Sequence, residues 1–464
     1  MNTIFLHQIH DNLRSLRFQV SLGILLLFFV ANGVIYALKI DRLVAEDAQI
    51  QADLDRRLET IETLSDGVGN WYKILTPPAG TEFMAEAGFN WFQHALWLNP
   101  STGETSWLGQ TRTTNNWMRR FEVVDWALIV RYVLSFLCIV LSYNAISGEL
   151  ERGTLRLALS NSLSRGRFLM GKFFAHLVTL TVATVLGSAI SLLILTLSGA
   201  VELDAWMAGR YLLFLLAATV FTSTFLLLGM TVSILARRSA SSLVLLITAW
   251  TVLVVVIPQT SYLIAVHAVD PVGAFWERIN GEQNEVREAL AREGLDPRPM
   301  NLAKADNYAI EKRYTRRLEE MEKKINQMRR DVDSQQLRQY LVARQVNLLS
   351  PSFAFQYSLE TFLGAGVQRF ENFNRQGWRY RDSLRAFFRG RDAEDPDSPH
   401  IQFLPEFMSE KKLDSKDIPR YREVPLTVAD SIGGGMTPII VLVLEAALAF
   451  FLALWAFNRA ELAG

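Results

Sequence analysis

Six apolar segments constrain what this 464-residue chain can fold into. Each has about 20 residues or more, the length a helix rising about 1.5 Å per residue needs to cross roughly 30 Å of hydrocarbon. Because the bilayer core offers no water to backbone amides, such segments must be helical. The segments cover residues 18–38, 124–143, 173–198, 211–235, 241–266 and 437–457. We therefore predict an all-α membrane protein with six transmembrane helices.

The first segment is expected to stay in place as a membrane anchor. Its apolar core is about 20 residues long, and no small-x-small cleavage site precedes the charged residues after Lys39. Residues 1–17 place apolar side chains at helical spacing before this segment. These side chains are Leu6, Ile9, Leu13 and Leu16. The pattern predicts an N-terminal interfacial helix, which acts either as a brace for the bundle or as a simple anchor.

Basic residues in the short connections indicate the orientation, because such residues stay in the cytoplasm. They precede the first segment, separate the second from the third and the fourth from the fifth, and follow the sixth. They are Arg14, Arg17, Arg152, Arg156, Arg165, Arg167, Lys172, Arg237, Arg238 and Arg459. Six spans with both termini in the cytoplasm place all four groups on one side. We predict a multi-pass protein of a bacterial inner membrane.

Two long polar segments, 39–122 and 267–435, then lie outside and are predicted to form an α-rich extracytoplasmic domain. Apolar residues from 50 to 64, three or four apart, predict that an amphipathic helix continues from the first span. The second segment carries a heptad-like seam and a shorter helix near 282–293, which together predict a helical hairpin. The seam residues are Tyr314, Leu318, Met321, Ile325, Met328 and Val332. The seam is expected either to pack on the 50–64 helix as a stalk or to dock an extracytoplasmic protein.

Composition and motifs argue against catalysis and nucleic-acid binding. The chain has 47 basic and 47 acidic residues, whereas nucleic acid favours a basic surface. Cys138 is the single cysteine, and the six histidines show no pair at metal-ligand spacing, so no metal site is expected. Residues 166–172 have the spacing of a P-loop, but Phe173 stands where the motif needs Ser or Thr for Mg²⁺. We interpret that match as accidental, and we expect neither a catalytic residue nor a bound cofactor in this chain.

The segment 148–170, between the second and third spans, carries the strongest functional signal. It begins with a short charged helix that two spans hold at the bilayer surface, where it can receive force from a soluble partner. Four charged residues offer ion-pair contacts to such a partner, and two glycines permit close backbone approach. These residues are Glu149, Glu151, Arg152 and Arg156, with Gly148 and Gly153. The alternative is an ordinary basic loop that only satisfies the topology rule.

The order of interfacial helix, six spans and charged helix resembles the type-2 ABC transporter permeases. The positions that match the pattern of that family are Glu149, Gly153, Thr154, Leu155, Ser160, Ser164, Arg165, Gly171 and Lys172. The resemblance implies that residues 148–156 form a coupling helix seated in a groove of an ATP-binding cassette ATPase subunit. ATP and Mg²⁺ are then expected on that subunit. It also implies a dimer with a second copy or a homologous permease.

The long insertions resemble a subgroup of those permeases with a large domain between the last two spans. Leu349, Ser350 and Pro351, followed by Phe370 and Phe373, carry this likeness.

Two ionisable residues fall inside predicted spans, Arg131 in the second and Glu445 in the sixth. Charges in lipid are costly and are usually paired or functional. Counted from the outer ends of their spans at about 1.5 Å per residue, their depths differ by roughly 3 Å, so we predict an intramembrane ion pair. The alternatives are that either residue lines a substrate path, or that Arg131 extends to the outer interface.

The function predicted from these features is that of a permease subunit, not an enzyme, which couples ATP hydrolysis by a separate subunit to export or extraction of a substrate. The alternative is a mechanotransmission subunit that moves an extracytoplasmic stalk or protein partner without transport. A purely structural scaffold would explain the insertions but not the charged helix. Membrane lipid is an expected partner and nucleic acid is not.

Overall fold

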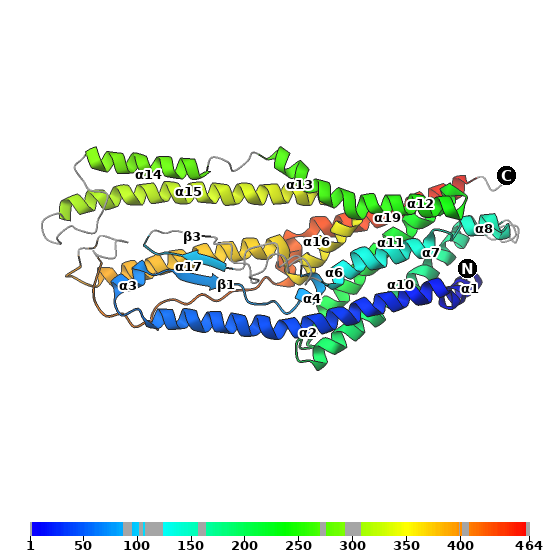
Figure 1. The fold of residues 1–464 in the computed structure, drawn as a ribbon, viewed down its shortest axis with the longest axis horizontal. Helices are drawn as coiled ribbons and strands as arrows, with labels where there is room; N and C mark the ends of the chain where they lie inside the picture. The colour runs from blue at the N-terminus through cyan, green and yellow to red at the C-terminus, as the bar shows by residue number, and fades with distance from the viewer. Residues whose placement is uncertain are drawn as a thin grey trace.

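The computed structural model describes residues 2–86, 95–101, 105–106, 124–155, 164–269, 275–292, 308–398, 400 and 408–460. The molecule is elongated, with a helical bundle at one end and a mixed α/β module, here called the distal module, at the other (Figure 1). Both termini lie at the bundle end (Figure 1). This arrangement separates a long apolar body from a polar region far from the termini.

Six helical runs are long and apolar enough to cross a membrane, which confirms the predicted number among the described residues. Four are single helices: α2 (Leu16–Glu59), α10 (Arg165–Leu197), α11 (Ala205–Ala236) and α19 (Met436–Arg459). The second run joins α6 (Trp126–Leu128), the π-helical η2 (Ile129–Leu134), α7 (Ser135–Ser142) and α8 (Ser147–Glu151). The fifth joins α12 (Ser239–Trp250), the π-helical η3 (Thr251–Val256) and α13 (Ile257–Ala268). The all-α membrane fold is therefore confirmed.

Small residues allow the spans to pack closely in the bundle. A Cβ atom on Gly229 of α11 would lie 1.8 Å from Ser142 Oγ of α7, and one on Gly187 of α10 would lie 2.4 Å from the Phe29 ring of α2. Membrane helices associate through such close packing, because lipid gives no hydrophobic drive between them. Trp126 is fully buried beside these helices, with its ring centroid 4.7 Å from that of Phe214.

The N-terminal helix α1 (Asn2–Arg14) is separate from α2, because the chain breaks at Ser15, whose side chain caps α2 through the Phe18 amide. Asn12 Nδ2 is 3.1 Å from His176 Nδ1 and 3.3 Å from Thr179 Oγ1, both on α10. The predicted N-terminal helix is therefore attached to a span by buried polar contacts.

Helix α16 (Pro351–Leu363) was predicted to belong to the outside insertion, but it packs into the core of the bundle. All 13 of its residues are buried, mainly against α11 and α19. Ser350 donates a hydrogen bond to the Leu253 carbonyl of η3 just before α16 begins. Part of the 267–435 segment is thus inseparable from the spans.

The distal module combines helices with a small sheet, which the sequence did not predict. Strands β1 (Tyr72–Leu75), β2 (Ala95–Leu98) and β3 (Thr105–Ser106) are antiparallel in the order β1-β2-β3. The neighbouring helices are α3 (Leu64–Gly69) and α17 (Gly366–Ala393), whereas α4 (Glu82–Ala85) and α18 (Val428–Gly434) pack against the bundle helices α6 and α16. The buried core of the module joins the sheet to α3 and α17 through Leu96, Val68 and Phe388.

The predicted helical hairpin is formed by α14 (Phe275–Arg292) and α15 (Tyr308–Asn347). Seam residues Met321, Ile325 and Met328 cluster with Ile279 of α14, and Lys324 Nζ lies 2.6 Å from Glu282 Oε1. The expected packing of this seam on the 50–64 helix is wrong, because α14 folds back and covers the seam. In Figure 1, α15 and α2 lie on opposite sides of α17.

Candidate functional site

Helix α8, at the bundle end beside both termini, is the candidate coupling site (Figure 1). Its first turn is tied to α11, since Ser233 Oγ accepts hydrogen bonds from the amides of Ile146 (3.2 Å) and Ser147 (3.0 Å). Gly148 is buried, and a Cβ atom there would lie 3.7 Å from Ser239 Oγ. The helix is therefore packed against the neighbouring spans and does not extend freely from them.

Glu149 ties α8 to α10. Its Oε1 lies 2.7 Å from Lys172 Nζ, and the two side chains are 24% and 6% exposed. Thr154 donates a hydrogen bond to the other carboxylate oxygen, and the Lys172 ammonium lies 5.4 Å from the Phe168 ring centroid. A charge-assisted hydrogen bond between partly buried groups is stronger and more directional than a surface pair. The contact joins two residues of the predicted family pattern.

Glu151 ties α8 to α12. Its two carboxylate oxygens accept hydrogen bonds from the Ser239 amide (2.8 Å) and hydroxyl (2.7 Å) at the first residue of α12. A carboxylate at a helix N-terminus satisfies unpaired amides and interacts favourably with the helix dipole. Both predicted carboxylates therefore contact the chain's own spans, while Glu151 also stays exposed to solvent.

Residues 152–154 form the exposed tip of the coupling segment. Arg152 Nε donates to the Gly148 carbonyl at 3.0 Å, which folds its side chain back along α8. Gly153 has a φ of +74°, a left-handed conformation that favours glycine, and a Cβ atom added there would meet no described atom within 4 Å. Leu155 is buried, and Arg156 lies outside the described residues. Among the described residues of this segment, 151–154 are exposed to solvent.

The P-loop-like stretch is helical in the structure. Residues 166–172 lie within α10, which begins at Arg165 behind the Ser164 cap, so they form no loop around a phosphate. Lys172 is engaged by Glu149.

The predicted pair of Arg131 and Glu445 is not formed. Arg131 Nη1 donates to Gln356 Oε1 of α16 at 3.3 Å, and its guanidinium lies 4.0 Å from the Phe353 ring centroid. Glu445 Oε2 is buried and has no hydrogen-bond partner among the described residues. The depth estimate considered six spans only, whereas α16 packs against both η2 and α19 and supplies the partner of Arg131.

Comparison with known proteins identifies the family. The model of the ABC-2 family transporter proteins matches residues 2–462, almost the whole chain. The chain belongs to this family. It is a multi-pass transmembrane permease subunit of the ABC transporter type.

Two curated permeases are similar to parts of this ABC-2 chain. The probable ABC transporter permease protein NosY of Stutzerimonas stutzeri is 31% identical over 137 residues, 29% of this chain and 49% of that protein. The probable NosY of Pseudomonas aeruginosa strain PAO1 is 34% identical over 115 residues, 25% of this chain and 42% of that protein. The chain thus spans about half the length, or less, of the curated relatives it matches.

Several residues that hold α8, the candidate coupling helix, were missed or misread from sequence. Ser233 and Ser239 gave no signal, because a serine in an apolar run is common and its partner lies more than 80 positions away. The Asn12–His176 contact was likewise invisible, although a histidine within an apolar span is itself a signal of a polar partner. Lys172 was noted for charge and motif only.

Proposed function

We propose that this permease subunit is driven at α8 by a separate ATP-binding cassette ATPase subunit, and that the movement exports or extracts a substrate. ATP and Mg²⁺ would be held by that partner. The observation that carries this proposal is the attachment of α8 to three spans besides its own, through Ser233, Lys172 and Ser239. A displacement of α8 is therefore shared by α7, α10, α11 and α12.

The energetics of these contacts support a rigid lever. Breaking a buried ion pair by removing one partner costs about 3–5 kcal/mol, and the partial exposure of Glu149 lowers this to about 2–3 kcal/mol for its pair with Lys172. A partner that pushes on residues 152–154 would thus move the spans before it breaks these contacts. Rigid-body movement of helices is a common form of switching between two states.

The same proposal covers assembly and location. A second copy, or a homologous permease, would complete the transporter, since an ATPase working in pairs needs two coupling helices. The bundle end with α1, α8 and both termini would face the cytoplasm of a bacterial cell (Figure 1). The short basic connections support this orientation.

Mechanotransmission is a second candidate, favoured by the continuity of α2. This helix has 44 residues and no break, which corresponds to roughly 66 Å at 1.5 Å per residue. About half of that length exceeds a hydrocarbon core of roughly 30 Å. A movement of the first span would therefore be carried directly into the distal module, where an extracytoplasmic protein would receive it.

The coupling proposal is tested by the ATPase activity that co-purifies with the tagged full-length chain from its native cells. Arg152→Glu reverses the charge at the exposed tip, and we expect it to lower co-purified ATPase at least about tenfold, the loss that 1.4 kcal/mol of binding energy produces. Arg459→Glu is the matched control, because Arg459 is an exposed arginine at the same end and packs on the Trp455 ring of its own helix. Equal ATPase recovery with both variants would overturn the proposal.

A helix break in α2 separates the two candidates. Glu46 lies on an exposed face of α2 beyond the first span, so Glu46→Pro interrupts the rod and Glu46→Ala does not. If the distal module is moved mechanically, the proline variant keeps ATPase activity but loses the ATP-dependent distance change between spin labels on α2 and α17. Export or extraction, in contrast, is expected to persist in that variant.

A further inference from the structure

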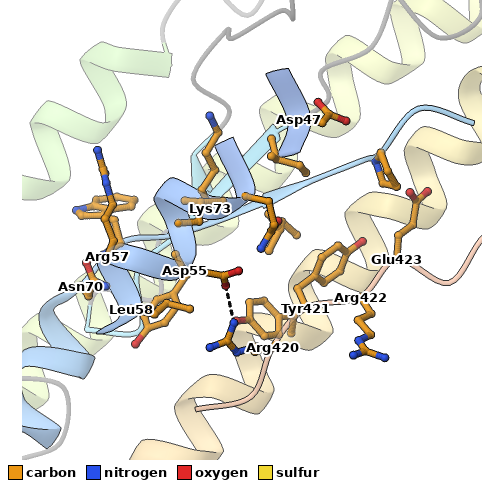
Figure 2. A pocket seen from close by; sticks show the side chains of 18 of the residues that line it. Asp47, Asp55, Arg57, Leu58, Asn70, Lys73, Arg420, Tyr421, Arg422 and Glu423 are labelled. Carbon is orange, nitrogen blue, oxygen red and sulfur yellow. Dashed lines mark hydrogen bonds and ion pairs between the residues drawn. The ribbon is translucent and has the colours of Figure 1, made fainter. Parts of the chain in front are cut away.

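A cavity of about 430 Å³ lies in the distal module, and nothing in the coupling at α8 uses it. Its walls are the last turns of α2, strand β1 with the residues before it, Tyr380 of α17 and residues 420–423 (Figure 2). Sites for small molecules commonly have this size and combine apolar walls with a few polar groups. The cavity therefore has the dimensions of a ligand site.

Four aromatic side chains line the cavity, Trp71, Tyr72, Tyr380 and Tyr421, and two of them are held by hydroxyl hydrogen bonds. Tyr72 donates its hydroxyl hydrogen bond to the Gly67 carbonyl (2.8 Å), and Tyr380 donates to the Pro419 carbonyl (2.8 Å). The Tyr421 hydroxyl is different, since it is buried and has no partner among the described residues. A buried hydroxyl without a partner is costly, and an acceptor atom of a ligand would satisfy it.

The acidic groups around the cavity are largely neutralised by arginines. Arg420 bonds Asp55 across the cavity, as the dashed line in Figure 2 shows. Arg369 contacts Glu423 through two hydrogen bonds of 3.1 and 3.0 Å. These pairs connect the cavity walls and neutralise two of the three acidic residues that line it, the third being Asp47.

Four cationic residues line the cavity: Arg57, Lys73, Arg420 and Arg422. Arg57 and Lys73 extend to the same side of the cavity in Figure 2. Burial and the charge of Arg57 both lower the pKa of Lys73, which indicates that the two positive charges disfavour each other. Arg57 forms no ion pair with any residue that the structure describes. An anion between the two groups would relieve this repulsion.

We propose that this cavity binds a small amphiphilic anion, with its apolar body against the aromatic wall and its anionic group at Arg57 and Lys73. The Tyr421 hydroxyl would donate to a polar atom of the same ligand. The site goes beyond the proposed function, because ATP-driven movement of α8 does not require it. A ligand here would bridge α2 and the 420–423 segment and so bias their relative position.

The test uses naphthalene-2-sulfonate, a flat aromatic anion that fits the cavity, and the neutral naphthalene-2-sulfonamide. Binding to the full-length chain in phosphatidylcholine nanodiscs is measured by calorimetry, with empty nanodiscs as the blank. We expect saturable binding of the sulfonate, at least about tenfold tighter than that of the sulfonamide. This comparison is made within the wild-type protein and needs no variant to fold.

Variants then locate the anionic group. Arg57→Gln with Lys73→Gln is expected to abolish the tenfold preference for the sulfonate, and Tyr421→Phe to weaken both probes. Arg56→Gln is the matched control, because Arg56 is exposed on the same turn of α2, pairs with Asp53 and does not line the cavity. The proposal is overturned by absent saturable binding, by equal binding of the two probes, or by a preference that survives the double variant. No ATPase enters this experiment, so its failure leaves the coupling proposal untouched.

Discussion

Replacing Lys172 by Met is expected to destabilise the attachment of α8 to α10. The Lys172 ammonium and the Glu149 carboxylate are 2.7 Å apart, and their side chains are 6% and 24% exposed. Removing one partner of a buried pair typically costs about 3–5 kcal/mol. Because a quarter of the Glu149 side chain stays accessible to water, its carboxylate is partly solvated, and we expect a loss of about 2–3 kcal/mol in the free energy of unfolding.

The assay is SDS-induced unfolding of the purified full-length chain, followed by tryptophan fluorescence. The double variant Glu149→Gln with Lys172→Met removes both charges, so its stability should return to within about 1 kcal/mol of the wild type. Lys416→Met, at an exposed lysine of the distal module, is the control and should change stability by no more than about 0.5 kcal/mol.

The same variants should distinguish an effect on unfolding stability from an effect on the ATPase response. The double variant regains stability but lacks the tie between α8 and α10, so co-purified ATPase should still respond poorly to any substrate or partner. If Lys172→Met is as stable as the wild type, the pair contributes nothing and the reasoning from burial is wrong. If the double variant regains both stability and ATPase response, the pair is structural only and does not transmit force.

Two further predictions concern charges elsewhere in the chain. A double-mutant cycle of Arg131→Met and Glu445→Gln should be additive within about 0.5 kcal/mol in SDS unfolding, because the two side chains do not meet; a coupling of about 2 kcal/mol or more would restore the sequence-based pairing. Hydrogen bonds from Lys411 and Ser409 lower the pKa of Asp395 to about 2. Because this pKa is lower in the folded than in the unfolded state, ionised Asp395 stabilises the fold above the unfolded-state pKa. This contribution to stability is lost as Asp395 becomes protonated, so the melting temperature should drop between about pH 4 and pH 2. Asp395→Asn should flatten that drop, and an unchanged slope would contradict the assignment.

The membrane part of the fold was predictable because a bilayer imposes a simple rule on sequence. Each span needs a long apolar run, and the six runs predicted from the sequence fall almost entirely within the six observed helical runs. The π-helical turns η2 and η3 were not predictable, since they change the hydrogen-bond register without changing composition. Positions within a span, such as that of Arg131, could therefore be estimated only roughly.

Helix α16 was not predictable from long apolar runs. It has 13 residues, too few to cross a bilayer, and it contains Gln356 and Glu360, so hydropathy assigned it to the polar insertion. In the fold these two side chains hydrogen-bond each other at 3.0 Å, and Gln356 also accepts from Arg131. Burial of Gln356 depends on a partner more than 200 positions away, which periodicity within one segment does not reveal.

Glu149 and Glu151 were predicted to offer ion-pair contacts to a soluble partner, and the structure adds contacts within the chain that the sequence did not reveal. Residues two apart on an α-helix point about 200° apart, so a helix as short as α8 presents them to opposite sides. One side faces Lys172 on α10 and the other faces Ser239 on α12. This geometry fixes α8 between two spans, while Glu151 stays exposed to solvent. A soluble partner that pushes on the exposed turn after the helix, at residues 152–154, would therefore move both spans.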